Sequence, residues 1–116
     1  MNKLEKLRLT LLKATSKVFY ATNEYDNEDN AELPFIVYQE INKKAPSFGD
    51  DRPSFYESVI QITLVTKQKD VSLETVLETA LLQDGYIFEV STEFRNSDKS
   101  LNRVYEVRLE DYLNGK

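Results

Sequence analysis

The sequence contains no cysteine and no histidine, and its 116 residues include only three glycines and three prolines. Without cysteine the chain can form no disulfide and offers neither a thiolate nucleophile nor a thiolate metal site. Without histidine it lacks the usual general base near neutral pH and the commonest zinc and haem ligand. Any chemistry would rest on carboxylates, Lys, Tyr, Ser and Thr. We therefore predict that the protein is not an enzyme and uses no cofactor or metal.

The scarcity of glycine excludes the loops that cradle phosphates. Gly49, Gly85 and Gly115 stand far apart, so neither a P-loop nor a dinucleotide fingerprint is present. Long apolar runs are also missing, because the longest near-apolar stretch, residues 33–38, is far too short to span a bilayer. Residues 1–12 hold no signal-peptide core, so we expect an intracellular protein without a membrane partner.

The charge balance is acidic, with 15 Lys and Arg against 20 Asp and Glu and a net charge of −5. Binding to nucleic acid requires clustered basic residues, so specific nucleic-acid binding is not expected. Hydrophobic residues make up 41% and charged residues 30% of the chain, which is typical of a folded globular domain. We predict a single domain over residues 1–116.

The first 32 residues predict a helix followed by an acidic segment. Apolar residues recur at a three-four spacing that indicates a helix over residues 3–20: Leu4, Leu7, Leu11, Ala14 and Val18. Lysines flank this stripe along one edge: Lys3, Lys6, Lys13 and Lys17. Residues 22–32 then read as a solvated loop and predict an acidic surface formed by Glu24, Asp26, Glu28, Asp29 and Glu32.

The middle of the chain predicts two strands joined by a long arm. Residues 35–41 are largely β-branched and aromatic and follow Pro34, and residues 56–65 alternate with one apolar face. The connection over residues 42–54 exceeds a hairpin turn, and long ordered loops tend to be functional. It supplies a candidate arm for contact with another subunit or a partner: Lys43, Lys44, Phe48, Asp50, Asp51 and Arg52.

The last third of the chain predicts a helix and a hairpin. Asp70 or Ser72 can cap the helix; with Ser72 as the cap, Val71 and Val76 would form a hydrophobic staple. Its core stripe comprises Leu73, Val76, Leu77, Ala80 and Leu81, and Gly85 ends it near residue 83. Residues 86–94 and 101–109 then predict an antiparallel hairpin.

These elements follow one another in the order α-β-β-α-β-β. Four strands and two helices predict an α+β two-layer sandwich, in which a mainly antiparallel four-stranded sheet carries both helices on one face.

The serial arrangement of the chain also resembles that of a known family. An N-terminal helix and an acidic segment precede the string Leu33-Pro34-Phe35-Ile36-Val37-Tyr38-Gln39-Glu40-Ile41. A proline-containing arm leads to a strand that ends Gln61-Ile62-Thr63-Leu64-Val65-Thr66-Lys67, before an Asp-started helix and a terminal hairpin. This order is similar, over nearly the full length, to the tail-terminator or tail-completion proteins of long-tailed phages and prophages, of the minor tail protein U type.

The resemblance implies a structural protein that stops polymerisation of the tail tube, caps it as a hexameric ring and presents the surface to which the filled head attaches. The implied partners are other copies of the chain, the tail tube protein and a head-completion or connector protein. The implied location is the host cytoplasm during assembly and then the virion tail. An acidic lumen would let DNA pass without sticking.

Two other classes of function stay open at this point. A non-viral small-molecule-binding or regulatory α+β domain would need a pocket between the helices and the sheet. An enzyme would need a polar cluster, which the sequence does not show.

Overall fold

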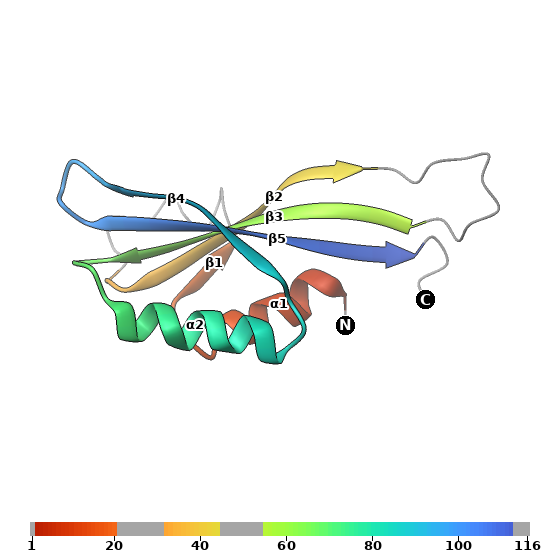
Figure 1. Ribbon diagram of the computed structural model, residues 1–116, viewed down its shortest axis with the longest axis horizontal. Helices are drawn as coiled ribbons and strands as arrows, with labels where there is room; N and C mark the ends of the chain where they lie inside the picture. Colours follow the sequence, from red (N-terminus) through yellow and green to blue (C-terminus); the bar gives the residue numbers. More distant parts are fainter. Residues whose placement is uncertain (1, 21–31, 45–54, 113–116) are drawn as a thin grey trace.

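The computed structural model describes residues 2–20, 32–44 and 55–112. In chain order the elements are α1 (Lys3–Leu11), β1 (Val18–Tyr20), β2 (Phe35–Lys44), β3 (Phe55–Thr66), α2 (Val71–Gln83), β4 (Phe88–Arg95) and β5 (Leu101–Tyr112). Both helices lie on the same face of one twisted sheet (Figure 1). The predicted α+β architecture, with two helices on one face of a sheet, is confirmed.

The sheet has five strands rather than the predicted four, in the order β1-β2-β3-β5-β4. β1 lies parallel to β2 at one edge, with Val18 beside Ile36 and Tyr20 beside Tyr38. The other strand pairs are antiparallel, and β4 with β5 forms the predicted terminal hairpin. The sheet is therefore mixed, with a single parallel pair among the described strands.

The fifth strand exists because α1 is shorter than predicted and ends at Leu11 rather than near residue 20. The chain turns directly after the helix, where the N–H of Lys13 donates to the carbonyl of Thr10 at 3.1 Å. Residues 18–20 are β-branched or aromatic, which favours a strand over a helix. Val18 is buried as predicted, but from β1. Its place in the helical spacing was therefore coincidental.

Asp70, rather than Ser72, is the N-cap of α2. The carboxylate of Asp70 accepts a hydrogen bond from the N–H of Leu73 at 3.0 Å. Val71 and Val76 are exposed, at 62% and 48%, and do not form the staple. Val76 was also predicted in the core stripe of this helix, and that assignment is wrong.

The C-terminal end of α2 matches the prediction. The helix ends at Gln83, and Gly85 has a φ of 90°, a conformation that glycine adopts without strain. This turn lets the N–H of Tyr86 donate to the carbonyl of Leu81 at 2.8 Å, which satisfies one of the last helical carbonyls. The chain then reverses into β4.

The hydrophobic core lies between the two helices and the helix-facing side of the sheet. Its fully or almost fully buried members are Leu7, Leu11, Ile36, Ile60, Ile62, Leu64, Leu77, Leu81, Tyr105 and Val107. They come from both predicted helical stripes and from the apolar faces of the strands, so the burial predicted from these patterns is confirmed. Among the described residues, no helix is long and apolar enough to cross a membrane.

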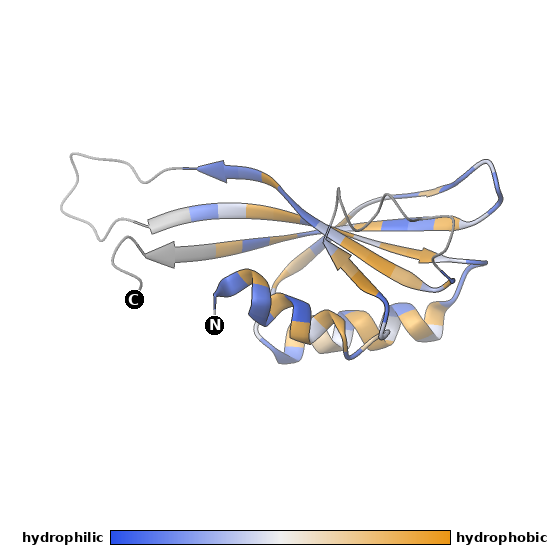
Figure 2. Cartoon of the chain, turned by 180° about the vertical axis from the view of Figure 1, so that it is seen from behind, coloured by the Kyte–Doolittle hydropathy of each residue, from blue (hydrophilic) through white to orange (hydrophobic). Residues whose placement is uncertain are grey.

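The far ends of three strands reach past the helices (Figure 1). We call residues 41–44 of β2, 55–59 of β3 and 108–112 of β5 the distal sheet. β2 continues to Lys44, so the start of the predicted arm over residues 42–54 is a strand rather than a loop. Figure 2 shows that the distal end of β2 is hydrophilic, whereas apolar residues gather in the strands over the helices.

We expect Leu77→Ala and Ile62→Ala each to lower the free energy of unfolding by about 2–5 kcal/mol, because both side chains are fully buried between helix and sheet. Val76→Ala is the matched control, since Val76 lies on the exposed side of the same helix, and it should change stability by no more than about 0.5 kcal/mol. Urea denaturation measures all three. A loss below about 1 kcal/mol at both core sites would contradict this packing.

Candidate functional site

The predicted contact arm divides between a strand and residues outside the described part of the chain. Lys43 and Lys44 form the end of β2 and pair with Ser58 and Glu57 of β3. Both lysines therefore belong to the distal sheet. The other predicted arm residues lie outside the described residues: Phe48, Asp50, Asp51 and Arg52.

Of the predicted acidic surface, the structure describes Glu32 alone. Its side chain is 86% exposed, and its carboxylate lies 3.7 Å from the Nζ of Lys17. The other four members lie outside the described residues: Glu24, Asp26, Glu28 and Asp29. The acidic surface thus stays a prediction at those four positions, while Glu32 has a cation beside it.

The predicted basic edge of the N-terminal segment is partly neutralised. Besides Lys17, which faces Glu32, Lys13 places its Nζ 2.9 Å from a carboxylate oxygen of Asp84, at the C-cap of α2. The hydroxyl of Thr10 donates to the same carboxylate at 2.6 Å. These hydrogen bonds, from Thr10 first and then Lys13, lower the pKa of Asp84. They join the C-terminal ends of the two helices.

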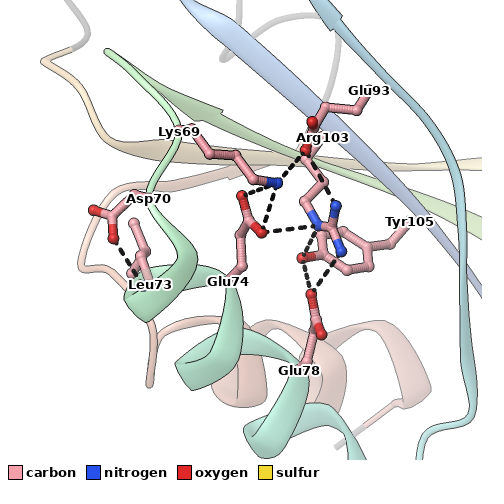
Figure 3. A network of polar contacts seen from close by, with 8 residues as sticks. All are labelled: Lys69, Asp70, Leu73, Glu74, Glu78, Glu93, Arg103 and Tyr105. Carbon is pink, nitrogen blue, oxygen red and sulfur yellow. Dashed lines mark hydrogen bonds and ion pairs between the residues drawn. The ribbon is translucent and has the colours of Figure 1, made fainter.

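A group of charged side chains joins α2 to β4 and β5 on the helix-facing side of the sheet (Figure 3). Arg103 of β5 lies at its centre. Its guanidinium places one nitrogen 3.1 Å from Glu93 of β4, another 3.1 Å from Glu78 of α2 and Nε 3.6 Å from Glu74. Glu74 is 7% exposed in its side chain, so its charge is buried beside that of Arg103.

Two further residues complete the network. The Nζ of Lys69 lies 3.0 Å from Glu74 and 2.8 Å from Glu93. The hydroxyl of Tyr105 donates to Glu78 at 2.7 Å and accepts from the Nε of Arg103 at 2.9 Å. We call the six residues the charge cluster: Lys69, Glu74, Glu78, Glu93, Arg103 and Tyr105.

The electrostatics of the charge cluster favour a structural role. Hydrogen bonds to Glu93 and Glu74 raise the pKa of Lys69, and the hydrogen bond from Lys69 lowers the pKa of Glu93. Burial lowers the pKa of Arg103, but its hydrogen bonds to Tyr105 and the glutamates outweigh burial and raise it. Burial and the bond to Glu78 raise the pKa of Tyr105, which keeps the phenol protonated. A general base needs a pKa near the working pH, and these shifts lead away from it.

Sequence reasoning missed the charge cluster, although a signal for it exists. Leu101, Arg103, Tyr105 and Val107 alternate onto the helix-facing side of β5, so Arg103 is a charge within an apolar face. A buried charge needs a partner. Glu74 and Glu78 are four residues apart on α2 and can therefore meet one neighbouring cation.

The opposite face of the sheet carries an uncharged concavity of about 320 Å³. Its lining residues are Val37, Gln39, Gln61, Thr63, Thr92, Phe94, Asn102 and Val104. The amide of Gln39 donates to that of Gln61 at 3.2 Å within it. This concavity lies away from the interface of helices and sheet. The alternative small-molecule-binding function was predicted to need a pocket at that interface, where core side chains are packed instead.

The two outer strands of the described sheet, β1 and β4, do not extend along the distal sheet. β1 covers β2 only over residues 36–38, and β4 covers β5 only over residues 101–107. In the described part of the chain, no strand pairs with the outer sides of residues 41–44 or 108–112. Open strand edges are templates for pairing with another chain. The distal sheet is therefore the candidate functional site.

We expect Arg103→Ala to lower the free energy of unfolding by about 2–3 kcal/mol, because it leaves the buried Glu74 with one fewer cation. The side chain of Arg103 is itself 20% exposed, which keeps the loss below that of a fully buried pair. Arg108→Ala is the matched control: it removes a 70% exposed partner of Glu57 and should cost no more than about 1 kcal/mol. Equal losses in urea denaturation would contradict the structural role of the charge cluster.

The charge cluster also predicts how stability depends on pH. The folded-state pKa of Glu93 is lowered from 4.5, so its contribution is present above that value and is lost as the pH falls through the folded pKa. Glu93→Gln should therefore lower stability at neutral pH and reduce the loss of stability between about pH 5 and 3. Urea denaturation at a series of pH values measures the slope, and an unchanged acid slope would refute the assignment.

Comparisons with known proteins assign this chain to no family. No protein-family model matches the chain, and no curated protein matches its sequence. Among solved structures, a chain from the "Virion of native gene transfer agent (GTA) particle" aligns with 92% of this chain and 90% of its own length. The aligned residues are 12% identical, and the TM-score is 0.48. At that identity and TM-score the alignment assigns the chain neither a family nor a function.

Proposed function

We propose that this protein is a structural component of a phage or prophage tail. In this proposal it is a tail terminator, which caps the tail tube as a ring, ends tube polymerisation and forms the surface that joins the head. The order of elements along the sequence supports the proposal. The strand edges of the distal sheet support the proposal independently.

The observation that carries the proposal is the placement of two uncovered strand edges at one end of the molecule. They belong to opposite sides of the distal sheet, residues 41–44 on one side and 108–112 on the other. A ring needs a head-to-tail contact in which each subunit offers different surfaces to its two neighbours. A subunit with an uncovered edge on each side meets this requirement.

The remaining features are consistent with a passive conduit. The net charge is −5, and a negative ring lets DNA pass by repulsion. The proposed partners are further copies of the chain, the tail tube protein and a head-completion or connector protein. The protein would act in the host cytoplasm during assembly and then remain in the virion tail.

The proposal gives the protein no catalytic role and no cofactor. The charged side chains of the charge cluster form ion pairs with one another. Burial and hydrogen bonding keep the phenol of Tyr105 protonated. Within residues 2–20, 32–44 and 55–112, no group of three or more acidic residues is placed to hold a metal ion.

A second candidate function rests on the uncharged concavity. Its volume of about 320 Å³ and its amide groups fit a small polar ligand, as a regulatory domain would require. A thermal-shift screen against uncharged metabolites separates the two functions. A saturable rise in melting temperature, lost in Gln61→Leu, would favour the regulatory reading over the tail reading.

Disruption of the gene in its native host tests the tail proposal directly. We expect tail tubes of variable length, because nothing would end polymerisation of the tube. We also expect tails that are not joined to filled heads, because the surface for head attachment would be missing. Electron microscopy of induced particles provides the measurement, and a plasmid copy of the gene should restore normal tails. Normal joined particles without the protein would refute the proposal.

The proposal also predicts that the purified protein has no measurable affinity for duplex DNA at physiological salt, because a conduit must not hold its cargo. Fluorescence anisotropy with labelled duplex DNA measures this. The feature most able to oppose the prediction is the basic edge of α1, where Lys3 and Lys6 are exposed. Binding at about micromolar concentration, abolished by Lys3→Ala with Lys6→Ala, would replace the passive conduit with a DNA-contacting role.

A further inference from the structure

One side of α2 carries exposed apolar residues and faces the β4–β5 hairpin. Residues at spacings of four, three and four form this side of the helix: Val71, Thr75, Glu78 and Leu82. The carboxylate of Glu78 accepts a hydrogen bond from the hydroxyl of Tyr105 on β5, the strand next to β4. Leu82 is 59% exposed, and Val71 is exposed as well. Two large apolar side chains therefore lie in solvent on either side of Glu78.

The edge strand β4 continues this surface. Val90 pairs with Tyr105 in the register of the sheet, so its side chain lies on the helix-facing side, and it is exposed. Exposed apolar residues that gather beside polar ones mark surfaces for protein–protein contact. We call this set of residues the α2 surface: Val71, Thr75, Glu78, Leu82 and Val90.

The charge cluster next to the α2 surface holds one more carboxylate than cations. Glu74, Glu78 and Glu93 share two cations. Lys69 contacts Glu74 and Glu93, so Glu78 has Arg103 as its cation and shares it with both other glutamates. The α2 surface is therefore apolar around a carboxylate in negative excess, and it is complementary to an apolar surface that brings a cation.

The exposed side of α1 has this complementary chemistry. Leu9 is 51% exposed, and Leu12, three residues further on, is exposed as well. Lys6 is exposed three residues before Leu9, and residues three apart are neighbours on a helix. We call these three residues the α1 surface: Lys6, Leu9 and Leu12.

The two surfaces lie on different sides of the molecule. α2 and β4 lie in front of α1 and β1 in Figure 1, and β4 and β1 are the two outermost strands of the described sheet. One copy therefore cannot bring its own two surfaces together. A head-to-tail contact between identical subunits requires two different, complementary surfaces of this kind.

We propose that the α2 surface of one copy binds the α1 surface of the next copy. Leu82 and Leu9 belong to the apolar contact, and Lys6 supplies the cation that the neighbourhood of Glu78 lacks. The second copy is the occupant because the chain itself carries the matching apolar residues and the opposite charge. This inference deepens the proposed ring and rests on the proposed function for the role of that ring in the tail. The contact itself is tested on the purified protein.

A charge placed in the apolar part of either surface tests the contact. We expect Leu82→Asp and Leu9→Asp each to weaken self-association at least about tenfold, because each would bury a carboxylate in an apolar contact. Val76→Asp is the matched control, since Val76 is an exposed apolar residue of α2 outside the α2 surface. Sedimentation equilibrium measures association, and circular dichroism verifies that each variant is folded. A wild-type protein that stays monomeric at its highest soluble concentration, or equal losses in all three variants, would overturn the proposal.

A mixture of two variants tests whether the contact is head-to-tail. The Leu82→Asp protein keeps an intact α1 surface, and the Leu9→Asp protein keeps an intact α2 surface. At a concentration where each variant alone is monomeric, we expect their mixture to form a one-to-one dimer and no larger species. A contact between two α2 surfaces would not be restored by mixing, so a mixture that stays monomeric would overturn the proposal.

A charge exchange tests the electrostatic part. Thr75→Lys places a cation of the chain itself on the α2 surface, one turn from Glu78, so it should repel Lys6 of the next copy. We expect Thr75→Lys and Lys6→Glu each to weaken association roughly threefold to fivefold, and the double variant to recover most of the loss. Lys67→Glu is the control, since Lys67 is exposed outside both surfaces. Additive losses in the double variant would refute the pairing of Lys6 with the α2 surface.

The two proposals can fail separately. Association that is lost in Leu82→Asp and Leu9→Asp, together with normal particles in the gene disruption, would keep this contact and remove the tail function. Defective tails in the gene disruption, together with unchanged association of both variants, would keep the tail function and remove this contact.

Discussion

The structure depends on one constraint: two amphipathic helices bury their leucines on the same face of a sheet centred on β3. Leu7 and Leu77, from different helices, are both fully buried in one core with Ile62 of β3. Because both helices occupy one face, neither of them covers the opposite face or the far ends of the strands. The placement of the helices thus sets where an interface can form.

The charge cluster supplements this hydrophobic constraint. Arg103 stands where a purely apolar strand would place another aliphatic residue, and it binds glutamates from α2 and β4 at once. Pairing of buried charges adds little net stability, but removing one partner is costly. The cluster therefore fixes the position of α2 over the β4–β5 hairpin rather than driving folding. We infer that it holds the sheet in one shape, which an assembly of identical subunits requires.

Periodicity predicted most of the fold, because alternation and three-four spacing report directly on burial. It failed at Val18, which fits the helical spacing of the preceding leucines by chance. Residues 18–20 are β-branched or aromatic and form a strand that pairs with β2. Periodicity misassigned Val76, which lies beside the buried stripe of α2 rather than within it. The candidate site was only partly foreseen, because Lys44 was expected in a loop. Which strand ends stay uncovered is set by pairing between distant segments, which local patterns do not encode.

We propose that this chain forms rings through the two edges of the distal sheet. Native mass spectrometry of the purified protein, over a range of concentrations, tests ring formation directly. We expect a single closed oligomer in equilibrium with the monomer, with no larger species as the concentration rises. A strict monomer at all concentrations, or an open-ended series of growing oligomers, would contradict it.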